Sequence, residues 1–259
     1  MFFRRKFCFM RFGCIQIDIL GTGLSSFIIK RNGDLIFCGF TANTYLSSIA
    51  MYVYEPFKIS EDVKGVGLIN SDIFFLKDNG DLFAYGDNSY GQLGIDTADF
   101  VNEPVQIENN VKNISTGAYH SLILKNDGTL YACGYNEYGQ LGNLSYDNCS
   151  FLAEIANDVK DIAAGDNHSL ILKNDGSLYA CGDNQYGQMG INLPVKSDQH
   201  IKIINSNVVS IAAGGNHSFA IVDNGYLYSW GNNEFYQLGD GTTDNRNSPV
   251  CIIPEPGNP

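Results

Sequence analysis

Three histidines recur at a regular interval in this sequence, and a serine follows each of them. They are His120, His168 and His217, separated by 48 and 49 positions. Three imidazoles from successive repeats of a fold could bind one zinc ion together. The interval, however, follows a repeat length rather than a metal-ligand spacing, and two earlier repeats have Ser25 and Asp72 at this position. We therefore predict histidines that begin a strand and hydrogen-bond a neighbouring backbone group, and no metal site.

The remaining reactive side chains indicate neither catalysis nor a cofactor. The seven cysteines form no C-x-x-C pair, and Cys38, Cys133 and Cys181 share one repeat position, which is typical of small buried side chains in a reducing compartment. No nucleophile-elbow, Walker or zinc-protease motif occurs. The "GTGLSS" run at Gly21 lacks the third glycine of a dinucleotide-binding loop. We expect no enzyme activity, no cofactor and a cytoplasmic location, with the nucleus as the alternative compartment.

The composition indicates an acidic chain that can bury a core. Its 259 residues include 16 Lys and Arg against 28 Asp and Glu, a net charge of −12, and 44% of them are hydrophobic. A chain of this charge repels phosphate backbones, so we expect no nucleic-acid binding. No apolar run approaches the ~20 residues of a membrane span, so no membrane contact is expected. The expected partner is a protein, and the chain is expected to be a monomer.

A glycine that ends the phrase "LYACG", or a variant of it, divides the chain into repeats. It recurs at steps of 47, 48, 48 and 49 residues, at Gly39, Gly86, Gly134, Gly182 and Gly231. This spacing predicts a single domain over 1–259 that contains five repeats. The predicted boundaries are about 1–47, 48–95, 96–143, 144–191 and 192–240, with a closing strand over 241–253 and a tail over 254–259.

Each repeat contains four short runs that are typical of strands. In the third repeat these begin at Pro104, Val111, His120 and Thr129, and each is bounded by Gly, Asn or Asp. Asn-Gly or Asp-Gly between the last two runs favours a tight primed hairpin turn. The last run is apolar on both faces, as in a sheet that lies between two other sheets. Four strands in about 48 residues predict an all-β fold, a β-propeller of about five four-stranded blades.

A glycine-rich phrase follows the fourth run in repeats two to five. It reads "YGQLG" at Tyr90 and Tyr138, "YGQMG" at Tyr186 and "FYQLG" at Phe235. Its glycines permit a turn that a Cβ would block, its glutamines can bond turn amides, and its leucine or methionine offers an apolar plug between blades. We interpret the phrase as a joint between blades rather than a ligand-binding loop. Besides the three histidines, the structural repeat positions are Gly91, Gln92, Gly94, Gly139, Gln140, Gly142, Gly187, Gln188, Gly190, Gln237 and Gly239.

The pattern "GxxHSLxLxxDGxLYxxGxNxxGQLG", read across repeats three to five, resembles the repeats of the regulator of chromosome condensation family over roughly residues 20–253. The resemblance implies a β-propeller. Most members form seven blades, so five repeats are a departure. The repeats are compatible with a five-bladed ring, with a fragment or eroded form of a larger propeller, and with an open arc. The strand that opens each repeat has a last copy, "PVCII" from Pro249. We predict that this C-terminal strand joins the N-terminal blade and closes the propeller, because closure removes open sheet edges.

Three functions are compatible with this pattern. The first is a non-catalytic protein-interaction scaffold whose variable loops choose the partner. Phe100, Tyr146 and Phe151 are the candidate anchors, and the acidic surface favours a basic patch on the partner. The resemblance implies a second, guanine-nucleotide exchange on a small GTPase, although the regular spacing leaves no room for the wedge-like insertion linked to it in the founding member. Family behaviour also implies a third, inhibition of an enzyme by covering its active site.

Overall fold

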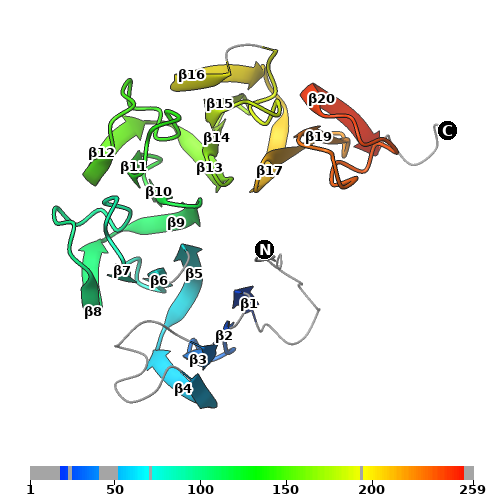
Figure 1. Cartoon of the computed structure of the whole chain (residues 1–259). Coiled ribbons are helices and arrows are strands. Elements are labelled where there is room, and N and C mark those ends of the chain that lie inside the picture. Colours follow the sequence, from blue (N-terminus) through cyan, green and yellow to red (C-terminus); the bar gives the residue numbers. More distant parts are fainter. Residues whose placement is uncertain (1–17, 23–24, 41–51, 70–71, 193–194, 254–259) are drawn as a thin grey trace. The chain divides into compact units, whose positions relative to one another are not determined.

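Strands account for all the regular structure in the part of the chain that the structure describes. The computed structural model describes residues 18–22, 25–40, 52–69, 72–192 and 195–253. Twenty strands and no helix occur there, in five four-stranded antiparallel sheets (Figure 1). The predicted all-β architecture of four-stranded units is confirmed. A helix long and apolar enough to cross a bilayer is absent from these residues.

Each sheet uses four strands that follow one another in the sequence. The first contains β1 (Asp18–Thr22), β2 (Ser25–Ile29), β3 (Leu35–Phe40) and β4 (Tyr52–Ser60). The second contains β5 (Val63–Ile69), β6 (Asp72–Lys77), β7 (Leu82–Gly86) and β8 (Val101–Glu108). The third contains β9 (Val111–Thr116), β10 (His120–Lys125), β11 (Leu130–Gly134) and β12 (Cys149–Ala156). The fourth contains β13 (Val159–Ala164), β14 (His168–Lys173), β15 (Leu178–Asp183) and β16 (Lys196–Ile204). The fifth contains β17 (Val208–Gly214), β18 (His217–Val222), β19 (Leu227–Gly231) and β20 (Arg246–Ile253).

The chain forms two compact units. Residues 1–88 and 99–111 make up the first unit, which holds the first two sheets. Residues 89–98 and 112–259 make up the second unit, which holds the last three sheets apart from the first residue of β9. In the first unit, Phe27 and Phe37 of one sheet share a buried cluster with Ile73 and Phe75 of the other. The first unit therefore has a hydrophobic core of its own.

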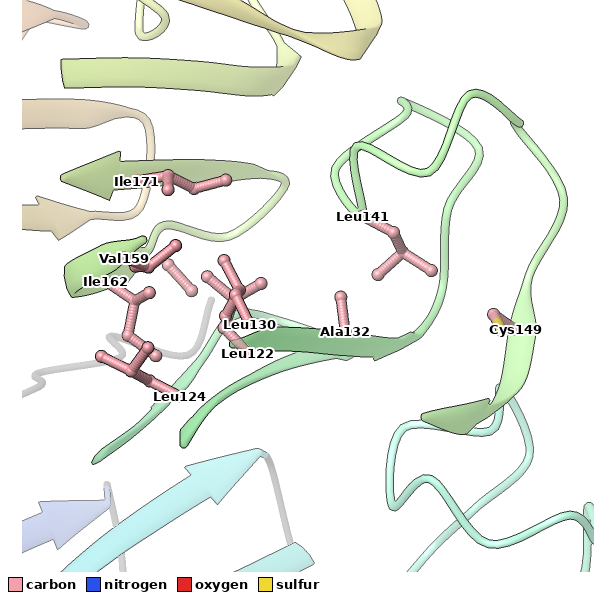
Figure 2. Packing of buried hydrophobic residues seen from close by; sticks show 10 residues of the cluster. Leu122, Leu124, Leu130, Ala132, Leu141, Cys149, Val159, Ile162 and Ile171 are labelled. Atoms are coloured by element: carbon pink, nitrogen blue, oxygen red, sulfur yellow. The ribbon is translucent and has the colours of Figure 1, made fainter. Parts of the chain in front are cut away.

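Neighbouring sheets bury one another in the second unit. Leu122 and Leu124 of β10 lie in one cluster with Val159 and Ile162 of β13 and Ile171 of β14 (Figure 2). Burying one such aliphatic side chain contributes roughly 1.5–3 kcal/mol. A second cluster joins the fourth and fifth sheets in the same way, through apolar side chains that include Leu170, Leu172, Val208, Ala220 and Trp230. The sheet-between-sheets packing predicted from the two apolar faces of the last run is thus present.

The hairpin turns differ from the predicted primed type. In the third sheet, the Lys125 amide bonds the Thr129 carbonyl and the Gly128 amide bonds the Lys125 carbonyl, so three residues form the loop. Gly128 has a φ of +88°, whereas Asn126 and Asp127 are not among the residues with positive φ. A two-residue primed turn of type I′ would need positive φ at both central residues. The observed loop is a type I turn followed by a left-handed glycine, which explains why the Gly is constant while the two residues before it vary.

The sheet boundaries are shifted by one strand from the predicted repeat boundaries. The strand that opens each sequence repeat pairs with the last strand of the preceding repeat, as β12 does with β11 and β16 with β15. The C-terminal strand follows the same rule. β20 pairs with β19 from Leu227–Ile253 to Gly231–Arg246, so the Pro249 run completes the fifth sheet and its predicted place in the N-terminal blade is wrong. The strand after each joint therefore runs antiparallel beside the strand that precedes the joint, which is the simplest connection between two neighbouring strands. Closure of the propeller stays a prediction.

Candidate functional site

The joints and the short turns of the second unit lie at one edge of its sheets. His120 pairs with Gly134 and His168 with Gly182, so the turns before β10, β14 and β18 share this edge with the joints after β11, β15 and β19. We call these loops, the strand ends next to them and residues 89–98 the loop edge. The hairpin turns around Gly128, Gly176 and Gly225 form the opposite edge, which we call the turn edge.

A buried asparagine organises each joint of the loop edge. In the joint after β11, the Asn136 Nδ2 group donates to Asn143 Oδ1 at 3.0 Å, to the Ser145 carbonyl at 2.8 Å and to the Asp147 carbonyl at 3.0 Å. Its Oδ1 accepts from the Leu141 amide at 3.0 Å. Asn184 and Asn233 make the corresponding bonds to Met189 and Leu238. One side chain thus satisfies several backbone groups that the joint would otherwise leave unpaired.

The glutamine of the phrase connects the joint to the next sheet. Gln140 Oε1 accepts from the Tyr138 amide at 3.1 Å, while its carbonyl accepts the Ser169 hydroxyl at 2.7 Å from β14. The Gln92 carbonyl accepts Ser121, and the Gln188 carbonyl accepts Ser218. The residue after each glutamine is fully buried in all four joints, at Leu93, Leu141, Met189 and Leu238. These contacts support our interpretation of the phrase as a joint.

Two of the three repeated histidines, His120 and His168, bond the serine hydroxyl of the next sheet. His120 Nε2 lies 3.0 Å from Ser169 Oγ, and His168 Nε2 lies 2.8 Å from Ser218 Oγ. Each serine donates its only proton to a glutamine carbonyl, so the imidazole Nε2 must be the donor to the serine. Burial lowers the pKa of His168 to about 3, which keeps the ring neutral. For these two histidines we predicted a backbone partner, whereas the bond that links successive sheets goes to a serine side chain.

The described residues contain no group of three His, Cys, Asp or Glu side chains placed as metal ligands would be. The cysteines of the repeat position are free thiols, and Cys133 and Cys181 are fully buried. Their Sγ atoms donate to the carbonyls of Gln92 and Gln140. Burial raises the pKa of the Cys181 thiol to about 12, so this side chain is a protonated packing group.

The three predicted anchors are exposed, and they are divided between the two units. Phe100 is 41% exposed and belongs to the first unit, whereas Tyr146 and Phe151, 41% and 58% exposed, belong to the second. The Lys196 Nζ group lies 4.4 Å from the centre of the Tyr146 ring. The loop edge of the second unit thus carries two of the three anchors.

Sequence reasoning missed the largest aromatic group of the loop edge. The rings of Tyr90, Tyr119, Tyr135 and Tyr138 lie together, with centroids 5.1 to 6.3 Å apart. The signal was available, because the third repeat has Tyr119 and Tyr135 where the fourth has Asn167 and Asp183. Two further aromatic residues, Phe235 and Tyr236 in the last joint, are 81% and 64% exposed. The loop edge is therefore rich in accessible aromatic side chains.

Comparison with known proteins identifies the family. A family model described as the RCC1-like domain matches residues 14–257. Yeast RCC1 (Prp20), in a crystal structure in which it is bound to Kap60, is 28% identical with a TM-score of 0.79, over 92% of this chain and 61% of that one. A structure of Prp20p from Saccharomyces cerevisiae, reported with its binding properties to Gsp1p and histones, is 28% identical with a TM-score of 0.77, over 92% and 64%. The chain therefore spans less than two thirds of the Prp20 chains it matches.

A more distant structure shares the fold. Human WBSCR16 is 21% identical with a TM-score of 0.78, over 92% of this chain and 67% of that one. A search of curated proteins found no match. The family model covers nearly the whole chain, and the chain's five four-stranded sheets correspond to blades of RCC1-type β-propellers. The chain belongs to the family of RCC1-like domains.

Proposed function

We propose that this chain is a non-catalytic protein-interaction module that binds its partner through the loop edge of the second unit. The observation that carries the proposal is the set of accessible aromatic side chains on this edge, which includes Tyr146, Phe151 and Phe235. Large aromatic residues supply much of the energy of protein interfaces. Their loops are held by the buried asparagine networks, so the surface is presented by a rigid scaffold.

A comparison of two variants tests this function. Tyr146→Ser with Phe151→Ser removes two exposed aromatic rings from the loop edge. Val209→Ser is the control, because Val209 is also apolar and 42% exposed but lies at the start of β17, at the turn edge. Tagged wild-type and variant chains are used to capture proteins from a lysate of the source cells, and the captured proteins are quantified by mass spectrometry.

We expect at least one protein to be captured about tenfold less by the loop-edge variant and unchanged by the control. A tenfold loss corresponds to about 1.4 kcal/mol, which is within the range for truncating an interface aromatic residue. Equal capture by all three chains would show that the loop edge is not the binding surface.

Guanine-nucleotide exchange on a small GTPase is the second candidate. It is favoured by the 28% identity to Prp20p, whose structure was reported with its binding properties to Gsp1p. An exchange assay with a panel of small GTPases and a fluorescent guanine nucleotide separates the two candidates. Acceleration well above the spontaneous rate, lost in the loop-edge variant, would assign exchange activity to this surface. If no member of the panel exchanges its nucleotide faster, the non-catalytic interaction module is the function that stands.

We also propose an intracellular location. Its support is that the cysteines in the described part of the chain form no disulfide, and that Cys133 and Cys181 are fully buried packing groups.

A further inference from the structure

The four-tyrosine cluster of the loop edge is built from two different loops and one turn. Tyr90 comes from residues 89–98, Tyr119 from the turn before β10, and Tyr135 and Tyr138 from the joint after β11. Tyr90 contacts Tyr119 and Tyr135 with ring centroids 5.1 and 5.3 Å apart. Tyr135 lies 6.3 Å from both Tyr119 and Tyr138. The Tyr135 amide also donates to the Tyr119 carbonyl at 2.9 Å, which fixes the two backbones together.

The four rings are tilted against one another rather than stacked. The four interplanar angles are 60°, 73°, 69° and 62°, and none of these pairs is stacked. A stacked pair covers a face of both rings, whereas a tilted or edge-to-face pair covers a face of only one ring. Tyr90 is 39% exposed, and the other three rings are half-buried. The cluster is thus a partly open aromatic surface and not a part of the core.

A carboxylate lies beside this surface. Tyr135 Oη donates to Glu137 Oε2 at 2.7 Å, and Glu137 itself is exposed. Burial, together with the Glu137 carboxylate, raises the pKa of the Tyr135 phenol, so the phenol stays neutral. Aromatic faces carry the negative part of the ring quadrupole, and a carboxylate adds a full charge. Both features favour a cation.

The charge of the loop edge also favours a cationic ligand. Among the described residues of the second unit, the loop edge carries nine carboxylates: Asp96, Glu137, Asp147, Asp166, Asp183, Asp198, Glu234, Asp240 and Asp244. Its two basic side chains are already engaged. Arg246 Nε bonds Asp240 Oδ2 at 2.6 Å, and Lys196 Nζ bonds the Glu137 carbonyl at 3.0 Å. A basic partner would therefore meet an excess of negative charge.

We propose that the tyrosine cluster binds an arginine side chain carried by a basic segment of a protein partner, with Glu137 as the counter-charge. The inference rests on the proposed interaction function and names the chemistry of the partner. Arginine fits better than lysine, because the planar guanidinium stacks on a ring and still donates hydrogen bonds to a carboxylate from its edge. A lysine of the chain itself makes a different contact at this edge, where Lys196 Nζ lies over the separate ring of Tyr146.

Peptide binding tests the proposal directly. The probes are fluorescein-labelled peptides with three Gly-Ser-Xaa repeats, in which Xaa is arginine, lysine, citrulline or glutamate, and binding is measured by fluorescence anisotropy. We expect the arginine peptide to bind most tightly, the lysine peptide more weakly, and the citrulline and glutamate peptides not measurably. Citrulline keeps the size and planarity of arginine without its charge, so equal binding of citrulline and arginine would overturn the proposal.

Two variants locate the binding at the cluster. Tyr119→Asn combined with Tyr135→Asn uses residues that other repeats carry at these positions, at Asn167 and Asn232, so the variant is expected to fold. We expect it to bind the arginine peptide about tenfold more weakly. Tyr119→Phe combined with Tyr135→Phe keeps the rings and should bind within about twofold of the wild type. Arginine-peptide binding that is unchanged in the asparagine variant, with an unchanged melting temperature, would contradict the proposal.

The outcome is separable from that of the proposed function. If partner capture depends on Tyr146 and Phe151 but no peptide discriminates arginine, the interaction function stands and this inference falls. If capture is equal in all chains and the peptides also bind equally, both fall.

Discussion

At the scale of single residues, the repeated histidines show that a pattern suggestive of metal ligands can instead reflect packing and hydrogen bonding between sheets. A serine follows each histidine along the chain, but the serine that the histidine contacts belongs to the next repeat, as for His168 and Ser218. The ring also occupies the space where Gly165 would carry a Cβ. The "GxxHS" pattern is therefore explained by packing and by a hydrogen bond between sheets, and a neutral imidazole suffices for both.

The stability of the chain should fall in mild acid because of these histidines. The pKa of His168 is about 3 in the folded chain and about 6.5 in the unfolded chain. Between these values only the unfolded chain binds the proton, so the free energy of unfolding decreases as the pH falls below 6.5 and is unaffected by this group above it. His200, with its pKa lowered to about 4, and His217 act in the same direction. From pH 7.5 to 5.0, His168 alone should remove about 2 kcal/mol, as measured by urea denaturation.

His168→Gln provides the comparison for this pH effect. Glutamine can still donate a hydrogen bond to Ser218 but does not titrate in this range. The variant should be less stable at pH 7.5 because of poorer packing, yet lose about 2 kcal/mol less than the wild type on acidification. The same pH dependence in both chains would rule out His168 as its source.

At the scale of elements, the joints show why one glycine is required. A Cβ at Gly139 would lie 2.6 Å from the Cα of Asp198 in β16, and a Cβ at Gly187 would lie 2.6 Å from the Cα of Asn247 in β20. The outer strand of the next sheet therefore packs directly on each glycine. The last joint has Tyr236 at this position, with a φ of +60° and 64% exposure, and no sheet follows β20 among the described residues of the second unit. The glycine is thus needed for the close approach of a strand more than for the backbone angle.

Two alanine substitutions separate these two requirements. Gly187 and Gly239 have positive φ values of +82° and +72°, but a Cβ at Gly239 would meet only the Ile252 Cδ1 atom at 3.8 Å. Gly239→Ala should cost about 1–2 kcal/mol from the left-handed backbone alone. Gly187→Ala should cost roughly 1–3 kcal/mol more, because it also displaces β20. Both are measured by denaturant unfolding, and equal losses would show that the strand contact at Gly187 contributes nothing.

At the scale of the whole molecule, charge is unevenly divided between the two edges of the second unit. Within the described ranges of this unit, the loop edge has nine carboxylates and two basic side chains, whereas most of the lysines lie at the turn edge: Lys112, Lys125, Lys160, Lys173 and Lys202. Much of the chain's net charge of −12 is therefore located at the loop edge, where the aromatic side chains are exposed. Such a surface should steer a basic partner toward the loops.

The association rate should therefore depend on salt and on the edge that is changed. Glu234→Lys with Asp244→Lys reverses two exposed charges at the loop edge, and Asp158→Lys with Asp223→Lys makes the same change in net charge at the turn edge. We expect the wild-type chain to bind the arginine peptide about tenfold more slowly in 500 mM than in 50 mM NaCl, as measured by stopped-flow anisotropy. The loop-edge pair should slow association several-fold at low salt. An equal effect of the turn-edge pair would indicate that only the total charge matters.

The fold class, the number of sheets and the family followed from the residues alone, because a period near 48 residues repeats the same local chemistry five times. The strand runs, the left-handed glycine of the hairpins and the joint phrase act within a few residues of one another, so they can be read without coordinates. The folded structure was needed to show which sheet each outer strand joins, which side chains His120 and His168 bind, and that tyrosines from three separate segments meet. These contacts join positions about 15 to 50 residues apart, and nothing in a local pattern specifies which of the equivalent partners in neighbouring repeats is chosen.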